Sequence, residues 1–336
     1  MARVRDNAGY IGIKYSANAT YQSGIWSIVE HERYAIGNPT FWNHSVLALD
    51  LLVVGGGGSG GYGRGAIDAG GGVSGVVFYK QNVPIANNTT YTIVIGAATS
   101  RATSSGVRYT GNDSSINGIF YGYSNSTIVG LGGGGGGAPN SCATGSQDNG
   151  QPGGSGGGGG NGGGGPYNAA YASGGAALQP TKNLVGPNVF IGGGYGTAGS
   201  GGWGGGGGGA STTTNSQTGG SGLQVNINGT ATYYGGGGSG GGQCSAPGGT
   251  LGGGGAGGYY WNGCLPRRDG TNNLGGGGGG GGSSGDLTGG AGGSGVVILN
   301  YPNTFGLAVS TTGSPSQTYY GANIVYKFTS SGTITF

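Results

Sequence analysis

The sequence predicts a mostly β protein in which a small β-sheet or sandwich frames a bundle of polyglycine II helices, with very little α-helix. Three observations support this fold class. Glycine accounts for 96 of the 336 residues, against a usual share of roughly 7%. Only 12 basic and 9 acidic residues are present, whereas charged residues make up about 25% of an ordinary domain. The chain nevertheless contains 21 tyrosines, 7 phenylalanines and 4 tryptophans, which argues against disorder.

The composition also excludes several classes of protein. Collagen needs glycine at every third position and far more proline than the 11 residues present. A net charge of +3 spread over the whole chain provides no electrostatic footprint for nucleic acid. Helical bundles are disfavoured, because each glycine costs about 1 kcal/mol relative to alanine inside a helix. Backbone hydrogen bonds in a dense array must therefore stabilise the glycine-rich part.

Strand patterns lie on both sides of the glycine-rich tract. Residues 45–54 alternate in a way that predicts a strand with one apolar face, made of Leu47, Leu49, Leu51 and Val53. β-Branched and aromatic residues predict further strands at 75–79, 89–95, 116–121, 127–129, 295–301 and 324–329. A turn at 330–332 leads into 333–336 and predicts a terminal hairpin. We therefore expect the segments 46–129 and 295–336 to meet across the tract as one small sheet or sandwich.

The tract itself, residues 130–294, is an irregular repeat of glycine runs and non-glycine inserts. Runs such as 132–137, 204–209 and 275–282 have no Cβ atoms. Extended threefold helices of glycine can therefore pack closely and exchange backbone hydrogen bonds in several directions. We predict a bundle of polyglycine II helices joined by exposed loops. Packing of glycine-rich β-turns is the alternative, because propensity alone does not separate the two.

Residues 1–45 differ from the rest of the chain and are predicted to form an attachment arm. They hold two of the four tryptophans and a short cluster of charge. The residues expected to attach the protein to its neighbours are Trp26, Glu30, Arg33 and Trp42. Ser27, with Glu30 three residues later, is typical of a helix N-terminus and favours one short helix over 23–36.

The sequence contains no pattern typical of catalysis, cofactor binding or a metal site. A G-x-G-x-x-G match at Gly58, Gly60 and Gly63 follows a strand, but the glycines directly after it exclude the helix that a dinucleotide site requires. His31 and His44 are the only histidines, and no Ser/His/Asp spacing or Walker lysine accompanies them. We therefore expect a protein without enzymatic activity, cofactor or metal.

Three cysteines, Cys142, Cys244 and Cys264, are widely spaced and have no histidine nearby. Metal sites use close cysteine pairs, and disulfide frameworks use an even number of cysteines. Free thiols are therefore favoured over a bridge between Cys244 and Cys264, although the sequence leaves that pairing open.

Aromatic and basic residues in the inserts of the tract are the candidate receptor-binding residues. They are Trp203, Tyr259, Tyr260, Trp261, Arg267 and Arg268. Tryptophan, tyrosine and arginine are enriched at binding hot spots, and aromatic rings stack on sugars, so this set suits a surface glycan bearing anionic groups. For any single aromatic residue, the alternative role of covering the edge of the glycine lattice is favoured. For the cluster at 259–269 as a whole, binding is favoured because charge is otherwise so scarce.

Five segments with glycine-rich or strand character follow one another in a distinctive order. They are Leu51–Gly58, Thr89–Gly96, Gly292–Tyr301, Thr311–Pro315 and Tyr326–Phe336. This order resembles the glycine-rich domain common in tail-fibre and other virion proteins of marine phages, cyanophages especially. The architecture is also similar to that of the distal adhesins of T-even-like phages, which combine an attachment domain, a polyglycine II sandwich and variable loops. Two departures are the irregular glycine blocks and an N-terminal arm that matches no such attachment domain.

The resemblance implies a structural protein of a phage virion, a tail fibre or adhesin tip that binds the host surface through loops between glycine-rich helices. The alternative is a head or tail decoration protein that only stabilises the particle. An ice-binding protein, a third class, would need flat threonine-rich faces that the sequence does not show. The expected partners are tail or capsid proteins through the arm and a host glycan or outer-membrane protein through the loops, with no nucleic acid. A homo-oligomer is left open, and the expected location is the virion.

Overall fold

The computed structural model describes only part of the chain. The described residues are 47–65, 67–122, 126–139, 149–160, 172–178, 189–192, 203–212, 216–242, 248–258, 269–283 and 287–336. The chain divides into two compact units, Met1–Leu47 and Ala48–Phe336, and all that follows concerns the second. The predicted arm and its short helix lie outside the described residues. The second unit is nearly all β with antiparallel sheets, which confirms the predicted β class.

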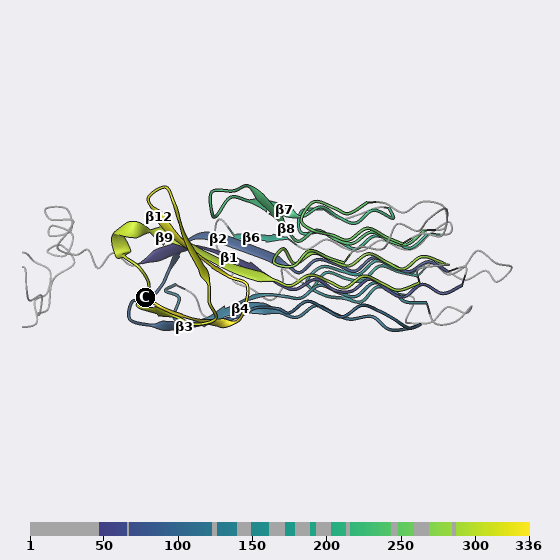
Figure 1. The fold of residues 1–336 in the computed structure, drawn as a ribbon, viewed down its shortest axis with the longest axis horizontal. Helices are drawn as coiled ribbons and strands as arrows, with labels where there is room; N and C mark the ends of the chain where they lie inside the picture. Colours follow the sequence, from purple (N-terminus) through teal and green to yellow (C-terminus); the bar gives the residue numbers. More distant parts are fainter. Residues whose placement is uncertain are drawn as a thin grey trace, which may run out of the picture. The chain divides into compact units, whose positions relative to one another are not determined.

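The larger sheet has six strands and brings the start and the end of the unit together. In order across the sheet, the strands are β11 (Ser316–Tyr320), β12 (Asn323–Phe328), β9 (Val296–Pro302), β1 (Ala48–Val54), β2 (Val77–Pro84) and β6 (Val189–Gly192). β1 pairs with β9 so that Leu51 lies opposite Leu299 (Figure 1). This pairing confirms that strands on the two sides of the glycine-rich tract meet in one sheet.

A second sheet of five strands packs against the first. Its strands, in order, are β10 (Ser310–Thr311), β13 (Gly332–Thr335), β3 (Thr90–Val94), β4 (Ser114–Asn117) and β5 (Thr127–Gly130). β1 contacts both β4 and β5. Between the sheets, the ring of Phe336 lies edge-on to Tyr91 of β3 and to Tyr301 of β9, with ring centroids 6.0 and 5.2 Å apart. The core of the sandwich is therefore built from aliphatic and aromatic side chains.

A small hairpin covers the other face of the six-stranded sheet. It consists of β7 (Leu223–Val225) and β8 (Thr232–Tyr234). Val225 and Tyr234 belong to a buried cluster that also contains Leu52 and Val54 of β1. The second half of β1 is therefore buried on both faces, where the sequence pattern predicted a single apolar face.

The predicted terminal hairpin is wrong. β12 lies in the six-stranded sheet between β11 and β9, so both of its edges are already paired. β13 has no free edge to join there and instead pairs with β3 and β10 of the other sheet. Five strands were also not predicted. The residues of β10 and β11 are mostly polar and do not alternate, and β6 (Val189–Gly192), β7 (Leu223–Val225) and β8 (Thr232–Tyr234) lie in the tract, where only glycine helices and loops were expected.

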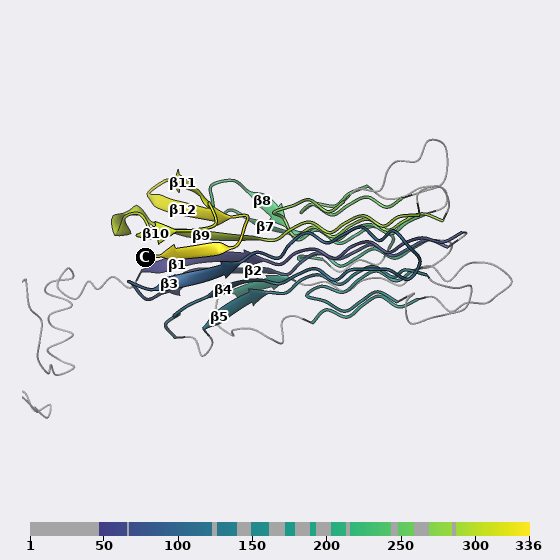
Figure 2. The same ribbon diagram turned by 60° about the horizontal axis from the view of Figure 1, so that its bottom comes forward.

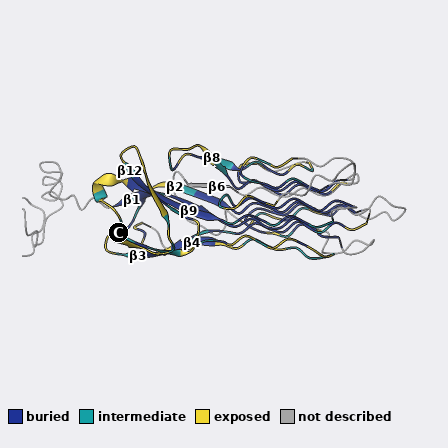
Figure 3. Cartoon of the chain, viewed as in Figure 1, coloured by how far each residue is buried: buried dark blue, intermediate teal, exposed yellow. Residues whose placement is uncertain are grey.

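The glycine runs extend from the ends of the strands as a set of aligned chains (Figures 1 and 2). Residues 55–63 and 69–76, which precede the tract, hydrogen-bond with runs inside it. Most glycines of these runs are buried, as Figure 3 shows. Within the described part of the tract, the only strands besides the last residue of β5 are β6, β7 and β8, and no α-helix occurs.

Hydrogen bonding in the first run, residues 55–63, repeats at every third residue. Successive backbone N–H groups point to three different neighbouring chains in turn. The donor and acceptor residues, with N···O distances of 2.7 to 3.0 Å, are Gly57–Gly293, Gly60–Gly290 and Gly63–Leu287 for one neighbour, Gly58–Val73 and Gly61–Gly70 for the second, and Gly56–Asn112 and Ser59–Tyr109 for the third. In a β-strand, the backbone groups of successive residues point alternately to two neighbouring strands, which gives a period of two. This run has a period of three and three neighbours, so it is not a strand.

Close approach of main chain to main chain explains why these positions are glycine. A Cβ on Gly57 or Gly60 would overlap the carbonyl oxygen of Gly276 or Gly279 on an adjacent run. The same holds for Gly63 against the carbonyl of Gly282. The glycine array therefore has an interior made mostly of backbone atoms, in contrast to the sandwich.

Candidate functional site

Of the predicted receptor-binding residues, the structure describes Trp203 alone. Tyr259, Tyr260, Trp261, Arg267 and Arg268 lie outside the described residues, as do the predicted attachment residues Trp26, Glu30, Arg33 and Trp42. Cys142, Cys244 and Cys264 lie outside them as well. The described part of the candidate site consists of Trp203 and of the residues around Asp269, which directly follows the insert 259–268.

Trp203 lies where two glycine runs end away from the sheets. It forms an isolated antiparallel bridge with Gly242, eight residues beyond the end of β8. The next residue, Gly204, donates its N–H to Gly241 at 3.0 Å, and a Cβ on Gly204 would overlap the carbonyl of Ala69. The side chain of Trp203 is 43% exposed. A large aromatic side chain is thus presented to solvent from a backbone that neighbouring runs hold on several sides.

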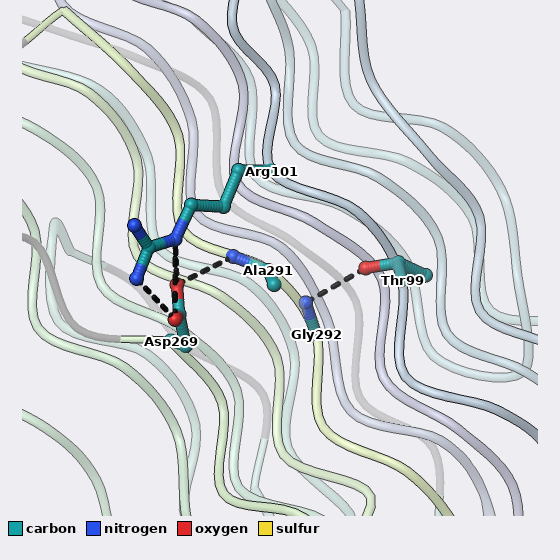
Figure 4. A network of polar contacts seen from close by, with 5 residues as sticks. All are labelled: Thr99, Arg101, Asp269, Ala291 and Gly292. Carbon is teal, nitrogen blue, oxygen red and sulfur yellow. Dashed lines mark hydrogen bonds and ion pairs between the residues drawn. The ribbon is translucent and has the colours of Figure 1, made fainter.

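A bidentate ion pair anchors the residue that directly follows the insert 259–268. Arg101, in the connection between β3 and β4, donates from Nε to Asp269 Oδ1 at 2.9 Å and from Nη2 to Asp269 Oδ2 at 2.6 Å (Figure 4). The two side chains are 49% and 37% exposed, so the pair contributes about 1 kcal/mol or less. Its planar geometry nevertheless fixes the direction of Asp269.

The same carboxylate also binds the glycine array. Asp269 Oδ1 accepts a hydrogen bond from the backbone N–H of Ala291 at 2.9 Å. Beside it, Thr99 Oγ1 accepts the N–H of Gly292 at 2.7 Å, and the N–H of Thr99 donates to the carbonyl of Gly292 at 3.1 Å (Figure 4). Three segments that are distant in sequence are therefore tied together at the base of the insert. We call Thr99, Arg101 and Asp269 the clamp.

The pairing of Arg101 with Asp269 was not predicted from the sequence. The two residues are 168 positions apart, and no local pattern connects them. One signal was available: charges are so scarce in this chain that each Arg and Asp is a candidate for a specific pairing.

A buried carboxylate lies inside the glycine array. Asp68 follows a tight turn in which Arg64 and Ile67 exchange backbone hydrogen bonds, and its side chain is fully buried. Burial raises the pKa of Asp68 to about 7. The hydroxyl and N–H of Ser283 face the carboxylate and partly offset this rise, but neither carboxylate oxygen meets the geometry of a hydrogen bond. Ionising Asp68 therefore destabilises the folded chain, and near pH 7 its carboxyl group is protonated in part of the molecules.

The space around the G-x-G-x-x-G match is occupied by main chain. A Cβ on Gly58 would overlap the carbonyl of Gly134, and Gly60 and Gly63 face the carbonyls described above. These glycines therefore serve packing between runs. Among the described residues, no group of three or more His, Cys, Asp or Glu is placed to hold a metal ion. No helix in the described part of the chain is long and apolar enough to cross a membrane.

Comparison with known proteins places the chain in a family. No curated protein and no solved structure is significantly similar to it. A family model described as a glycine-rich domain matches residues 38–224, which begin before β1 and end in β7. The runs at 235–242 and 275–282 lie beyond the match but share its hydrogen-bonded array, for example through the N–H of Gly72 and the carbonyl of Gly278. Because the model covers more than half of the 336 residues, the chain belongs to this family of glycine-rich domains.

Proposed function

We propose that the protein is a non-enzymatic structural component of a phage virion, a tail fibre or adhesin tip that binds the host cell surface. Its inserts between glycine runs would carry the receptor-binding residues, and residues 1–45 would attach it to other tail or capsid proteins. The five segments that resemble glycine-rich virion proteins support the virion assignment. The observation that carries the binding role is the exposed Trp203 at the end of two rigid runs.

The glycine array is held by backbone hydrogen bonds, which leaves the side chains of its inserts available for binding. Backbone hydrogen bonds hold the runs, so the side chains of the inserts are not required for packing and can vary at low cost. The clamp holds Asp269, the residue that directly follows the insert containing Tyr260, Trp261 and Arg268. An aromatic and basic insert on a fixed base suits recognition of an anionic surface glycan.

Phage particles that carry variants of this protein test the binding role. Trp203→Ala, and separately the triple variant Tyr260→Ala, Trp261→Ala and Arg268→Ala, should leave assembly intact and reduce adsorption to host cells about tenfold or more. Tyr121→Ala, which removes a 51% exposed aromatic side chain beside the sandwich, is the matched control and should adsorb normally. Normal adsorption by both variants would contradict the adhesin role and favour a decoration protein. Failure of particles to form would assign these aromatics to packing of the lattice.

Removal of the arm tests attachment. A chain lacking residues 2–40 should fold, because β1 begins only at Ala48, and should be absent from assembled particles. Purified particles would be assayed for the protein with an antibody against the folded unit. Incorporation at the normal level would show that another surface mediates attachment.

We also propose that the glycine runs are polyglycine II helices. The period of three in the donors of residues 55–63 supports this assignment, because a threefold helix directs every third N–H to the same neighbour. Measured backbone dihedral angles should cluster near φ of about −75° and ψ of about +145° in these runs. Carbonyl and Cα chemical shifts from solid-state NMR of glycine-labelled protein report these angles. Dihedral angles of the β region throughout the runs would contradict the proposal.

A further inference from the structure

One flank of the sandwich has defined structure although none of its residues is fully buried. Residues 302–322, which connect β9 to β12, include η1 (Asn303–Phe305), β10 and β11, and none of them is buried (Figure 3). The stretch also contains no Asp, Glu, Lys, Arg or His. We call it the uncharged flank. Ordering a residue costs about 1–2 kcal/mol in backbone entropy, and this flank recovers little of it by burying side chains, because only a few of its residues, such as Phe305 and Ala308, are half-buried.

β11 is an edge strand without the usual protection. It pairs with β12 at five consecutive positions without a bulge, and no described strand pairs with its other side. All five of its residues, Ser316–Tyr320, are exposed. Edge strands in native proteins commonly carry lysine, proline or a bulge that blocks pairing with another chain, and β11 has none of these.

Apolar side chains on the uncharged flank are also unusually exposed. Tyr319 is 64% exposed, Leu307 57% and Val309 75%. Tyr320 is held in place, because its ring lies against Gly229 in the turn of the β7–β8 hairpin, where a Cβ would crowd it. An open strand edge that carries an exposed aromatic side chain, in a stretch with other exposed apolar groups, is a typical docking surface for another strand.

We propose that a second copy of this chain occupies the edge, with β11 pairing antiparallel with β11 of the other copy about a twofold axis at Thr318. In this register Ser316 lies opposite the partner's Tyr320, and Gln317 lies opposite the partner's Tyr319. The two six-stranded sheets become one continuous sheet. The interface is isologous, so each copy contributes the same groups.

The charge distribution selects a second copy over other partners. An uncharged surface offers no electrostatic attraction to a charged partner. Two copies of an uncharged surface can also pair without repulsion between like charges. The nearest charge along the sheet is Lys327 of β12, opposite Ser316 and therefore at the end of the pairing rather than at the axis. The flank thus combines free backbone groups, apolar surface and neutrality, which together suit self-association.

Charge substitutions at the axis test the proposal on the whole chain. Thr318 is exposed, so Thr318→Lys and Thr318→Glu should fold normally, and each should place like charges opposite each other in the dimer. By sedimentation velocity and light scattering, the unsubstituted chain should dimerise with a Kd of about 10 µM or lower. Each variant alone should dimerise at least about tenfold more weakly, whereas an equimolar mixture of the two should recover dimers.

Thr92→Lys is the matched control, because Thr92 is an exposed threonine on the central strand β3 of the other sheet. It should dimerise like the unsubstituted chain. A monomeric unsubstituted chain at about 100 µM, or dimers that persist equally in both Thr318 variants, would overturn the proposal. Loss of dimers in both variants without recovery in the mixture would overturn the twofold register at Thr318.

Discussion

The β-sandwich and the glycine array of this chain are stabilised by opposite parts of the polypeptide. In the sandwich, side chains such as Leu52, Phe78 and Tyr301 fill the space between backbone layers and are almost wholly buried. In the array, most interior positions are glycine, and backbone carbonyls of one run occupy the space where a Cβ of the next would stand. Apolar side chains are therefore one way to exclude water from a protein interior, and dense backbone hydrogen bonding is another.

The largest expected effect is that of a single methyl group inside the array. Gly60→Ala should lower the free energy of unfolding by more than about 4 kcal/mol, because the added Cβ overlaps main chain that has no rotamer to escape into. Gly248→Ala is the control, since a Cβ there meets nothing within 4 Å, and it should change stability by less than about 0.5 kcal/mol. Chemical denaturation measures both. Similar costs for the two substitutions would contradict a backbone-packed interior.

Protonation of Asp68 should have the next largest effect. Its pKa is raised from 3.8 to about 7 in the folded chain, so the folded state binds the proton more tightly and the free energy of unfolding falls as pH rises from about 4 to about 7. Asp68→Asn removes this ionisation and should stabilise the protein by up to about 4 kcal/mol at pH 8 but very little at pH 4. The difference in midpoint of denaturation between variant and unsubstituted chain, measured across this range, is the test. A difference that does not change with pH would show that Asp68 is not buried as a carboxylate.

Truncation of a buried side chain should cost more stability in the sandwich than in the glycine array. Leu52→Ala, in the cluster beneath the β7–β8 hairpin, should cost about 3 kcal/mol because it leaves a cavity. Ala69→Gly also truncates a fully buried side chain, but it lies in the array and should cost about 1 kcal/mol or less. Equal losses on chemical denaturation would mean that side-chain packing matters as much in the array as in the sandwich.

Loss of the clamp should have the smallest effect on global stability and a larger local effect. Arg101→Gln should lower the free energy of unfolding by about 1 kcal/mol or less, because both partners are partly exposed. Trypsin should then cleave after Arg267 or Arg268 severalfold faster, since Asp269 loses one of its anchors. Arg64→Gln, which alters an exposed arginine at the turn after the first run, is the control and should leave this cleavage rate unchanged.

Much of the β framework followed from local sequence patterns. The alternation at Leu47–Val53 and the β-branched runs around Ile93 and Ile298 predicted β1, β3 and β9 to within a few residues. β11 was missed because its five residues are exposed on both faces and carry no alternation. Of the candidate binding residues, Trp203 alone lies among the described residues; it is partly exposed, and its role in binding stays a prediction.

Residue type and short-range period were enough to predict that this protein is β-rich and that its glycine runs pack through their backbone. Tertiary structure alone decided which strands are neighbours, that β1 is buried on both faces, and that β13 leaves the sheet of β12. It also decided that Arg101 meets Asp269 across 168 residues. Pairings of this kind depend on which edges and charges remain available after the chain has folded, and that competition has no signature in a local stretch of sequence.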